Sequence, residues 1–156
     1  EVEFHNGEPF DADSVKYTLE RVLDPENESL WRGQLTGIQS VEVIDNLTVR
    51  VITNGPFPAL PVLLARVPMV PPAYAEEAGL GGFASEPVGT GPFQFVEWVK
   101  DDRIVLEANP EHWKGSPKID RVVFKPIVED SARVAALKAG TVDVALSIPP
   151  DDAPVM

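Results

Sequence analysis

Histidine and cysteine are the side chains that most directly indicate metal or nucleophilic chemistry, and the chain has two histidines and no cysteine. His5 and His112 stand far apart, and neither has a second histidine at metal-ligand spacing. A zinc site would therefore need carboxylates for most of its ligands. The absence of cysteine excludes disulfides, thiolate nucleophiles and cysteine-based zinc or iron–sulfur sites. We expect neither a metal nor a cofactor.

Three other chemical motifs are incomplete. Gly89-Thr90-Gly91 is followed by proline and phenylalanine, where a nucleotide site needs a helix and a third glycine. Asp11 and Asp13 match the first two ligands of a calcium loop, but valine and lysine occupy the next ligand position and that of the obligatory glycine. A Gly-x-Ser-x-Gly nucleophile elbow does not occur. We predict no catalytic residue and expect that the protein is not an enzyme.

The charge balance is strongly acidic, because 13 Lys+Arg against 25 Asp+Glu give a net charge of -12. Such a surface repels phosphate backbones, so we expect no nucleic-acid partner. Nine of the acids fall within residues 1–30, where a solvated helix surface accounts for them. The uncharged residues 54–65 are too few and too rich in proline to span a bilayer.

The N-terminal part of the chain predicts a capped helix. Asp11 is a suitable N-cap, apolar residues recur at helical spacing from Val15 onward, and Asp24-Pro25 ends the pattern. The following residues 26–37 are polar and irregular, apart from the conspicuous Trp31.

A hairpin and a proline-rich connector follow. Residues 41–44 and 48–52 are β-branched runs around a turn-forming pair, which is the pattern of a β-hairpin. Eight prolines fall between residues 56 and 92, so we expect little regular structure there. Short helices are predicted at residues 60–65 and 73–78, the second closed by glycine.

The last part predicts α/β organisation. We expect strands at residues 92–99, 103–107 and 121–125, a helix at 130–138 capped by Asp130, and a final strand at 142–146. A strand, helix and strand in close succession indicate a right-handed parallel crossover. A subdomain boundary is expected near residues 87–91, where the connector gives way to regular strands.

Five segments resemble the signature motifs of one family, in the family's order and with its spacings. They are FHNGEPFDADSV at residues 4–15, VIDNLTV at 43–49, PVGTGPF at 87–93, RIVLEANP at 103–110 with Trp113, and AALKAGTVD at 135–143. The family is the extracellular solute-binding proteins of ABC importers, in the large peptide/nickel-binding class (family 5).

This resemblance implies a periplasmic-binding-protein-like fold of type II, which is α/β with a mixed sheet. In that fold two lobes trap a ligand and deliver it to a membrane permease. Residues 1–88 would form the small extra subdomain of lobe I, and residues 89–156 part of its main α/β sheet. The chain would thus be a fragment of lobe I. Its implied partners are a peptide or other small solute, the ABC permease subunits and the missing lobe II. The family also implies export, to a periplasm or to an anchored position outside the cell membrane.

The resemblance implies a ligand site as well. In several family members an aromatic residue a few positions after the Asp-Pro helix end faces the ligand cleft, and Trp31 occupies the matching position. We predict that Trp31 stacks on the ligand with Arg32 nearby; the alternative is that Trp31 packs in a satellite core. Arg66 is a further candidate, for binding a ligand carboxylate, and a solvent-facing role is its alternative.

Two other functions stay open at this point. One is a carboxylate-based hydrolase, since the sequence does not show how the acidic side chains are arranged in space. The other is a receptor-like sensor lobe that reports to a signalling partner. The ligand also stays open, because members of this class carry peptides, nickel complexes, opines, sugars or haem. We expect the chain alone to bind its ligand weakly, because half of a clamshell leaves most of a ligand solvated.

Overall fold

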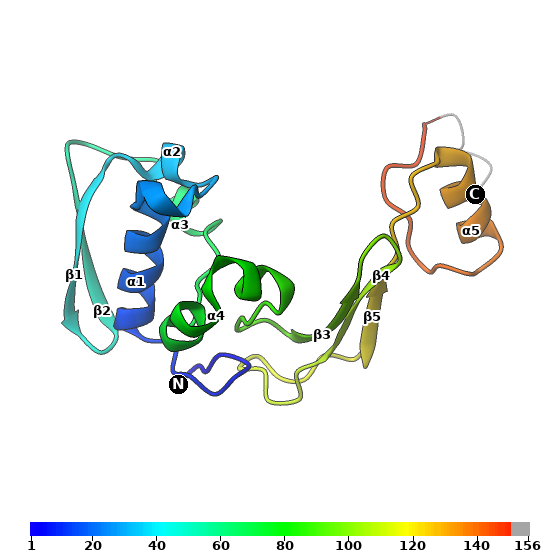
Figure 1. Cartoon of the computed structure of the whole chain (residues 1–156), viewed down its shortest axis with the longest axis horizontal. Helices are drawn as coiled ribbons and strands as arrows, with labels where there is room; N and C mark the ends of the chain where they lie inside the picture. The colour runs from blue at the N-terminus through cyan, green and yellow to red at the C-terminus, as the bar shows by residue number, and fades with distance from the viewer. Residues whose placement is uncertain (151–156) are drawn as a thin grey trace. The chain divides into compact units, whose positions relative to one another are not determined.

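The computed structural model describes residues 1–150 (Figure 1). Its helices are α1 (Ala12–Leu23), α2 (Arg32–Leu35), α3 (Leu60–Leu64), α4 (Pro72–Ser85) and α5 (Asp130–Lys138), with a 3-10 helix η1 at Pro25–Asn27. Its strands are β1 (Ile38–Asp45), β2 (Thr48–Thr53), β3 (Phe93–Val99), β4 (Arg103–Ala108) and β5 (Arg121–Phe124). The chain divides into two compact units. The first contains Glu1–Glu97 and Val105–Val122, and the second contains Trp98–Ile104 and the residues from Val123 onward.

Helix α1 begins at the predicted place because Asp11 and Ser14 cap it reciprocally. The Ser14 backbone N–H donates to Asp11 Oδ1, and the Asp11 N–H donates to Ser14 Oγ, both at 3.0 Å. An N-cap of this kind stabilises a helix by about 1 kcal/mol, since it satisfies donors that the first turn leaves unpaired. The predicted end at Asp24 is also confirmed. Residues 26–37, expected to be irregular, contain most of η1 and all of α2.

The predicted hairpin is confirmed, and it is longer than the β-branched runs that indicate it. Strands β1 and β2 are antiparallel and pair from Ile38 opposite Thr53 to Asp45 opposite Thr48. The hairpin packs against α1. The buried residues between them form a cluster that we call the first-unit core, made of Leu19, Val22, Leu35, Ile38, Val41 and Val67. Burial of aliphatic side chains of this size contributes about 1.5–3 kcal/mol each.

Helix α4 is longer than predicted. Gly79, the expected end, does leave the helical conformation with a φ of +63°. The helix resumes after it and continues to Ser85, because the second half packs back onto the first. The Phe83 ring lies 5.8 Å from the Tyr74 ring, and the Tyr74 hydroxyl donates to the Glu86 carbonyl at 2.8 Å.

The N-terminal segment holds two distant parts of the first unit. The Glu8 carboxylate accepts hydrogen bonds from the backbone N–H groups of Ala73 at 2.9 Å and Tyr74 at 3.0 Å. These donors belong to the N-terminus of α4, where unpaired N–H groups and the helix dipole favour a negative charge. His5 donates from Nε2 to the Gly91 carbonyl at 2.9 Å. Two of the motifs that carry the sequence resemblance are therefore joined in space.

Strands β3, β4 and β5 form a three-stranded sheet in that order. A short turn at residues 100–102 joins β3 to β4, and Asp101 in this turn has a φ of +62°. Neighbouring strands joined by so short a turn are antiparallel. The strands predicted at residues 92–99, 103–107 and 121–125 are confirmed to within one residue at each end.

The predicted cap of α5 is wrong. The N-cap is Glu129, which makes no side-chain capping bond, and Asp130 is the first helical residue. Asp130 instead forms an ion pair with Arg133 one turn later, so its carboxylate is turned along the helix and not toward the free N–H groups. Gly140, with a φ of +67°, ends the helix as expected.

The strand predicted at residues 142–146 is also absent, and with it the parallel crossover. Val144 and Leu146 are 76% and 75% exposed. A strand needs a neighbouring strand to pair its backbone groups, and within residues 1–150 none pairs with this segment. Arg133 holds the segment instead, because its Nη2 donates to the Ser147 carbonyl at 3.0 Å.

Candidate functional site

Trp31 and Arg66, two of the three predicted site residues, lie against each other in the first unit. Trp31 precedes α2, is half-buried and packs against the first-unit core. Arg66 lies after α3, and its Cζ is 5.2 Å from the centroid of the Trp31 ring. A cation–π contact of this kind contributes about 0.5–1 kcal/mol at an exposed site. The fold thus brings together two residues that the sequence separates widely.

Two short helices position this pair. Leu35 at the end of α2 is fully buried in the first-unit core, and Leu63 and Leu64 of α3 pack against the same cluster. The Trp31 backbone N–H donates to Ser29 Oγ at 3.3 Å. The indole ring and the guanidinium are therefore presented by elements that share one apolar anchor.

Arg32, the third predicted residue, is directed to the end of α1. It is exposed, and its Nε donates to the Leu23 carbonyl at 2.9 Å. Leu23 is the last residue of α1, where carbonyl groups lack intrahelical partners and a cation is favourable. The hydrogen bond from Arg32 therefore stabilises the end of α1, and Arg32 is not part of the Trp31–Arg66 pair.

The Trp31–Arg66 pair has the chemistry to bind an anionic group. A cation–π contact with the ring uses none of the guanidinium N–H donors, which remain available for a carboxylate. Arg66 is exposed, and within residues 1–150 its guanidinium has no ion pair or hydrogen bond. The Arg66 guanidinium also lies over one face of the Trp31 ring. A ligand that stacks on that face has to displace Arg66.

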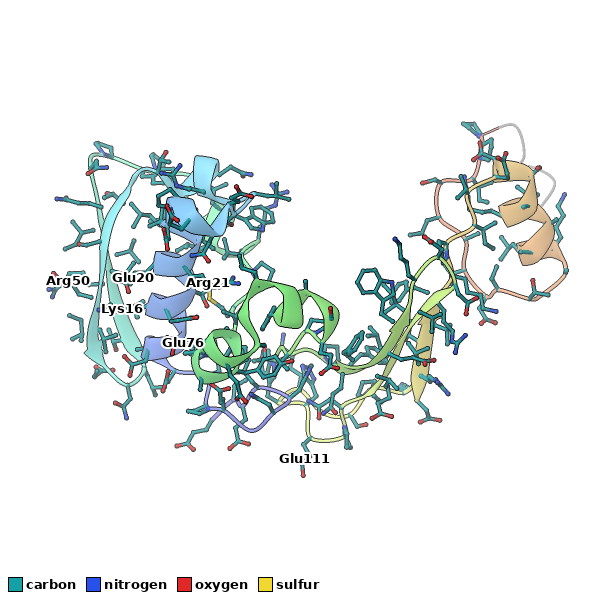
Figure 2. All side chains as sticks on the ribbon, viewed as in Figure 1. Lys16, Glu20, Arg21, Arg50, Glu76 and Glu111 are labelled. Carbon is teal, nitrogen blue, oxygen red and sulfur yellow. The ribbon has the colours of Figure 1, made fainter. Side chains whose placement is uncertain are left out.

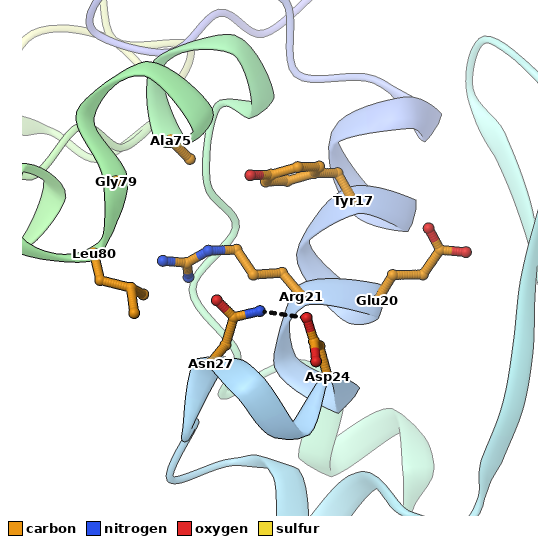
Figure 3. Close-up of a pocket in the computed structure, with 8 residues that line it drawn as sticks. All are labelled: Tyr17, Glu20, Arg21, Asp24, Asn27, Ala75, Gly79 and Leu80. Atoms are coloured by element: carbon orange, nitrogen blue, oxygen red, sulfur yellow. Dashed lines mark hydrogen bonds between the residues drawn. The ribbon is translucent and has the colours of Figure 1, made fainter.

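A second candidate site, absent from the sequence predictions, is an open groove of about 550 Å³ in the first unit, which we call the α1–α4 groove (Figure 3). It is lined by Tyr17, Glu20, Arg21, Asp24, Asn27, Ala75, Gly79 and Leu80. The four residues from α1 and its cap recur at intervals of three, one and three positions, so they form one polar stripe along the helix. This spacing is visible in the sequence. The polar stripe becomes one wall of a groove only because α4 forms the opposite wall.

Electrostatics in the α1–α4 groove favour a protonated tyrosine. Partial burial, and then the nearby Glu76 carboxylate, raise the pKa of Tyr17 above its usual value, while Arg21 acts in the opposite direction. The Tyr17 hydroxyl therefore remains a hydrogen-bond donor over the whole neutral range. At the C-terminal end of α1, on the same wall of the groove, Asn27 Nδ2 donates to Asp24 Oδ2 at 3.0 Å (Figure 3).

A smaller hollow of about 410 Å³ lies beside the joined motifs. It is lined by His5, Asn6, Tyr74, Glu86, Pro87, Val88, Gln94, Phe95 and Val96. Its histidine and tyrosine already donate to backbone carbonyls. In the described part of the chain, no three His, Cys, Asp or Glu side chains are placed to hold a metal ion. The same residues contain no helix long and apolar enough to cross a membrane.

Known proteins are similar to this chain in both sequence and fold. The family model for bacterial extracellular solute-binding proteins, family 5 Middle, matches residues 1–156. The glutathione-binding protein GsiB of Pectobacterium atrosepticum is 35% identical over 162 residues, which cover 99% of this chain and 30% of the relative. NikZ from Campylobacter jejuni, solved in complex with Ni(L-His), is 32% identical with a TM-score of 0.85 over 90% of this chain and 29% of NikZ.

The oligopeptide-binding protein AppA from Bacillus subtilis, solved in complex with a nonapeptide, also has a TM-score of 0.85. It is 26% identical over 99% of this chain and 32% of AppA. These structures confirm the predicted α/β fold class of the periplasmic-binding-protein type. The chain spans about 30% of the length of the curated relative. Because the family model matches over the whole length, the chain belongs to the bacterial extracellular solute-binding proteins, family 5.

Proposed function

We propose that this chain is part of the substrate-binding component of an ABC transporter, which captures a peptide or similar small solute outside the cytoplasmic membrane. The captured solute is delivered to permease subunits. The observation that carries the proposal is the match of all 156 residues to a family of extracellular solute-binding proteins. Relatives named for binding glutathione and oligopeptides support a peptide-like ligand. The protein acts in a periplasm or in an anchored position on the cell surface, and it binds its solute without turning it over.

The domain organisation proposed from the sequence is that of one lobe of such a binding protein. Residues 1–88 form the small extra subdomain of lobe I, and residues 89–156 contribute to its main sheet. The second lobe of the clamshell lies outside this stretch. A ligand then meets the Trp31–Arg66 pair as one part of a larger cleft.

Within that cleft, Arg66 binds a carboxylate of the ligand and Trp31 supports the guanidinium. The support for these roles is the free N–H edge of Arg66 and its contact at 5.2 Å with the ring. Trp31 also packs against the first-unit core, so it fixes where the guanidinium is presented. Arg32 contributes by stabilising the end of α1, from which the loop carrying Trp31 departs.

Native mass spectrometry of the native gene product, purified without refolding, tests the proposed function. We expect a peptide or a peptide-like solute to be retained and identified by its mass. Sustained hydrolysis of added peptides or glycosides by the same preparation would contradict the binding-protein proposal. Retention of a sugar or a metal complex, with no affinity for peptides, would refute the peptide class.

Calorimetry with the identified solute tests the site residues. Hydrogen bonds to charged groups contribute about 1.5–3 kcal/mol, so Arg66→Gln is expected to weaken binding by at least about tenfold. Trp31→Ala is expected to weaken it less, through loss of support. Arg50→Gln is the matched control, because Arg50 pairs with Glu42 on the hairpin and lies outside the site. Unchanged affinity in both Arg66→Gln and Trp31→Ala would remove the site from the proposal while leaving the function itself intact.

A further inference from the structure

The break in α4 shapes the α1–α4 groove. Gly79 combines a φ of +63° with a ψ of -175°, a region that side chains other than glycine rarely adopt. A Cβ at Gly79 would meet no atom within 4 Å, so the glycine is required for its backbone conformation and not for space. Leu80 follows immediately and lines the groove opposite α1 (Figure 3). The resulting volume of about 550 Å³ is in the range of small-molecule sites.

Arg21 is the central charged group of this groove. Its side chain extends from α1 toward Gly79 and Leu80 in Figure 3. Its Cζ lies 6.0 Å from the centroid of the Phe83 ring, in the second half of α4. Within residues 1–150 the guanidinium has no hydrogen bond or ion pair. The ring contact therefore positions the cation without using its five N–H donors, which have the geometry to bind a carboxylate in bidentate fashion.

Two neutral groups flank this cation. In the described residues the Tyr17 hydroxyl has no hydrogen-bond partner, and it lines the same groove as Arg21. The amide of Asn27 is fixed by its bond to Asp24, which leaves Asn27 Oδ1 as an acceptor. The groove thus offers donors at Tyr17 and Arg21, and acceptors at Asp24 and Asn27.

The charges select a ligand that carries both signs. Glu20 is paired with Lys16 at 3.8 Å, so Asp24 and Arg21 leave one charge of each sign in the lining; a simple anion is repelled by Asp24 and a simple cation by Arg21. A ligand with a carboxylate and an ammonium group satisfies both. The wall formed by Ala75 and Leu80 is apolar, and Leu80 is 55% exposed. Covering Leu80 with an apolar side chain of the ligand is therefore favourable.

We propose that the α1–α4 groove binds a free zwitterionic amino acid with an apolar side chain. Arg21 and Tyr17 bind its carboxylate, Asp24 and Asn27 its ammonium group, and Leu80 its side chain. The groove shares no residue with the Trp31–Arg66 pair, so binding at the groove can be tested independently of the transport ligand.

Titration of the isotope-labelled native gene product with L-leucine, followed by amide chemical shifts, tests the proposal. We expect saturable shifts at amides of α1 near Arg21 and of α4 near Leu80. Two analogues isolate the charges: 4-methylpentanoate lacks the ammonium group, and 3-methylbutylamine lacks the carboxylate. Each is expected to bind at least tenfold more weakly than leucine. Equal binding of either analogue, or no saturable shift with leucine, would overturn the proposal.

Variants locate the site. Arg21→Gln is expected to weaken leucine binding at least tenfold, and Tyr17→Phe severalfold. Arg50→Gln should leave leucine binding unchanged, because Arg50 lies on β2 (Figure 2), where it pairs with Glu42 at 3.1 Å. If the Arg21→Gln spectrum shows unfolding, Tyr17→Phe decides the question together with the analogues. Wild-type affinity in Tyr17→Phe and in any folded Arg21→Gln protein contradicts the assignment.

Discussion

The Thr18 hydroxyl links α1 to the segment that leads into α4. It donates to the Ser14 carbonyl at 2.8 Å and accepts from the Val70 N–H at 3.1 Å. Thr18 is 2% exposed and Val70 is 7% exposed, so water has little access to these groups. Thr18→Val keeps the shape of the side chain but removes both bonds. The Val70 N–H is then buried without a partner.

The expected loss follows from these two effects. A net hydrogen bond contributes about 0.5–1.5 kcal/mol, and a buried donor left unpaired costs about 1–3 kcal/mol. We therefore expect Thr18→Val to lower the free energy of unfolding of the first unit by about 2–3 kcal/mol. With a urea m-value of about 1–3 kcal/mol/M, this lowers the urea midpoint by about 0.7–3 M.

Urea unfolding followed by circular dichroism measures the midpoint, and amide hydrogen exchange of Val70 reports on the bond itself. The matched control is Thr18→Ser, which keeps the hydroxyl and loses one methyl group, at a cost of about 1 kcal/mol. We expect the Val70 amide to lose protection in Thr18→Val and to keep it in Thr18→Ser. Equal stability of the two variants, or unchanged exchange at Val70 in Thr18→Val, would refute this reasoning.

Three further substitutions test other parts of the first unit. Gly79→Ala should destabilise α4 by about 1–3 kcal/mol through its backbone conformation alone, whereas Gly81→Ala, which has open space and no positive φ, should be neutral or stabilising in thermal unfolding. Glu8→Gln should lower stability by about 0.3–1 kcal/mol, less at high salt, since it removes a charge from a helix N-terminus; an effect independent of salt in the same assay would contradict this. The backbone hydrogen bond from Leu47 is the largest of the causes that hold the pKa of Asp45 below its usual value, so its stabilisation is present above the unfolded-state pKa and lost as pH falls through the folded-state pKa. Asp45→Asn should therefore flatten the acid side of the pH–stability curve, and an unchanged curve would exclude this role.

Local signals explain which elements the sequence predicts correctly. Asp11 and Ser14 are three residues apart and cap α1 through hydrogen bonds to each other alone. The hairpin of β1 and β2 is fixed by a turn and by two β-branched runs beside it. Structures of this kind depend on neighbours within a few positions, so their residue types are sufficient evidence.

The predicted cap of α5 is wrong for a local reason, the Asp130–Arg133 pair, whereas the errors in strand position and helix length concern partners at a distance. Residues 142–146 have the composition of a strand, but no described strand pairs with them, and Arg133 holds their end instead. Gly79 breaks the helix as expected, yet the Tyr74–Phe83 contact restores it a residue later. Secondary structure at these places is decided by tertiary contacts, which override local preference.

For the candidate site, too, the sequence supplies some of the information and the tertiary structure the rest. The sequence singles out Trp31, Arg32 and Arg66, and their proposed roles in ligand binding remain predictions. Only the fold shows that the Arg66 guanidinium lies over the Trp31 ring while Arg32 donates a hydrogen bond to the end of α1. These contacts arise because α2 and α3 share a core, and no spacing along the chain encodes that.

By itself, the sequence determined the family, through five motifs in register, and the fold class that goes with it. It also determined the net charge of -12 and the absence of cysteine chemistry, because composition does not depend on folding. Only the tertiary structure decided that Glu8 caps a helix 65 positions away and that the polar stripe of α1 faces α4 across a groove. Such placements depend on which apolar faces are buried together, and burial is a property of the whole packed unit.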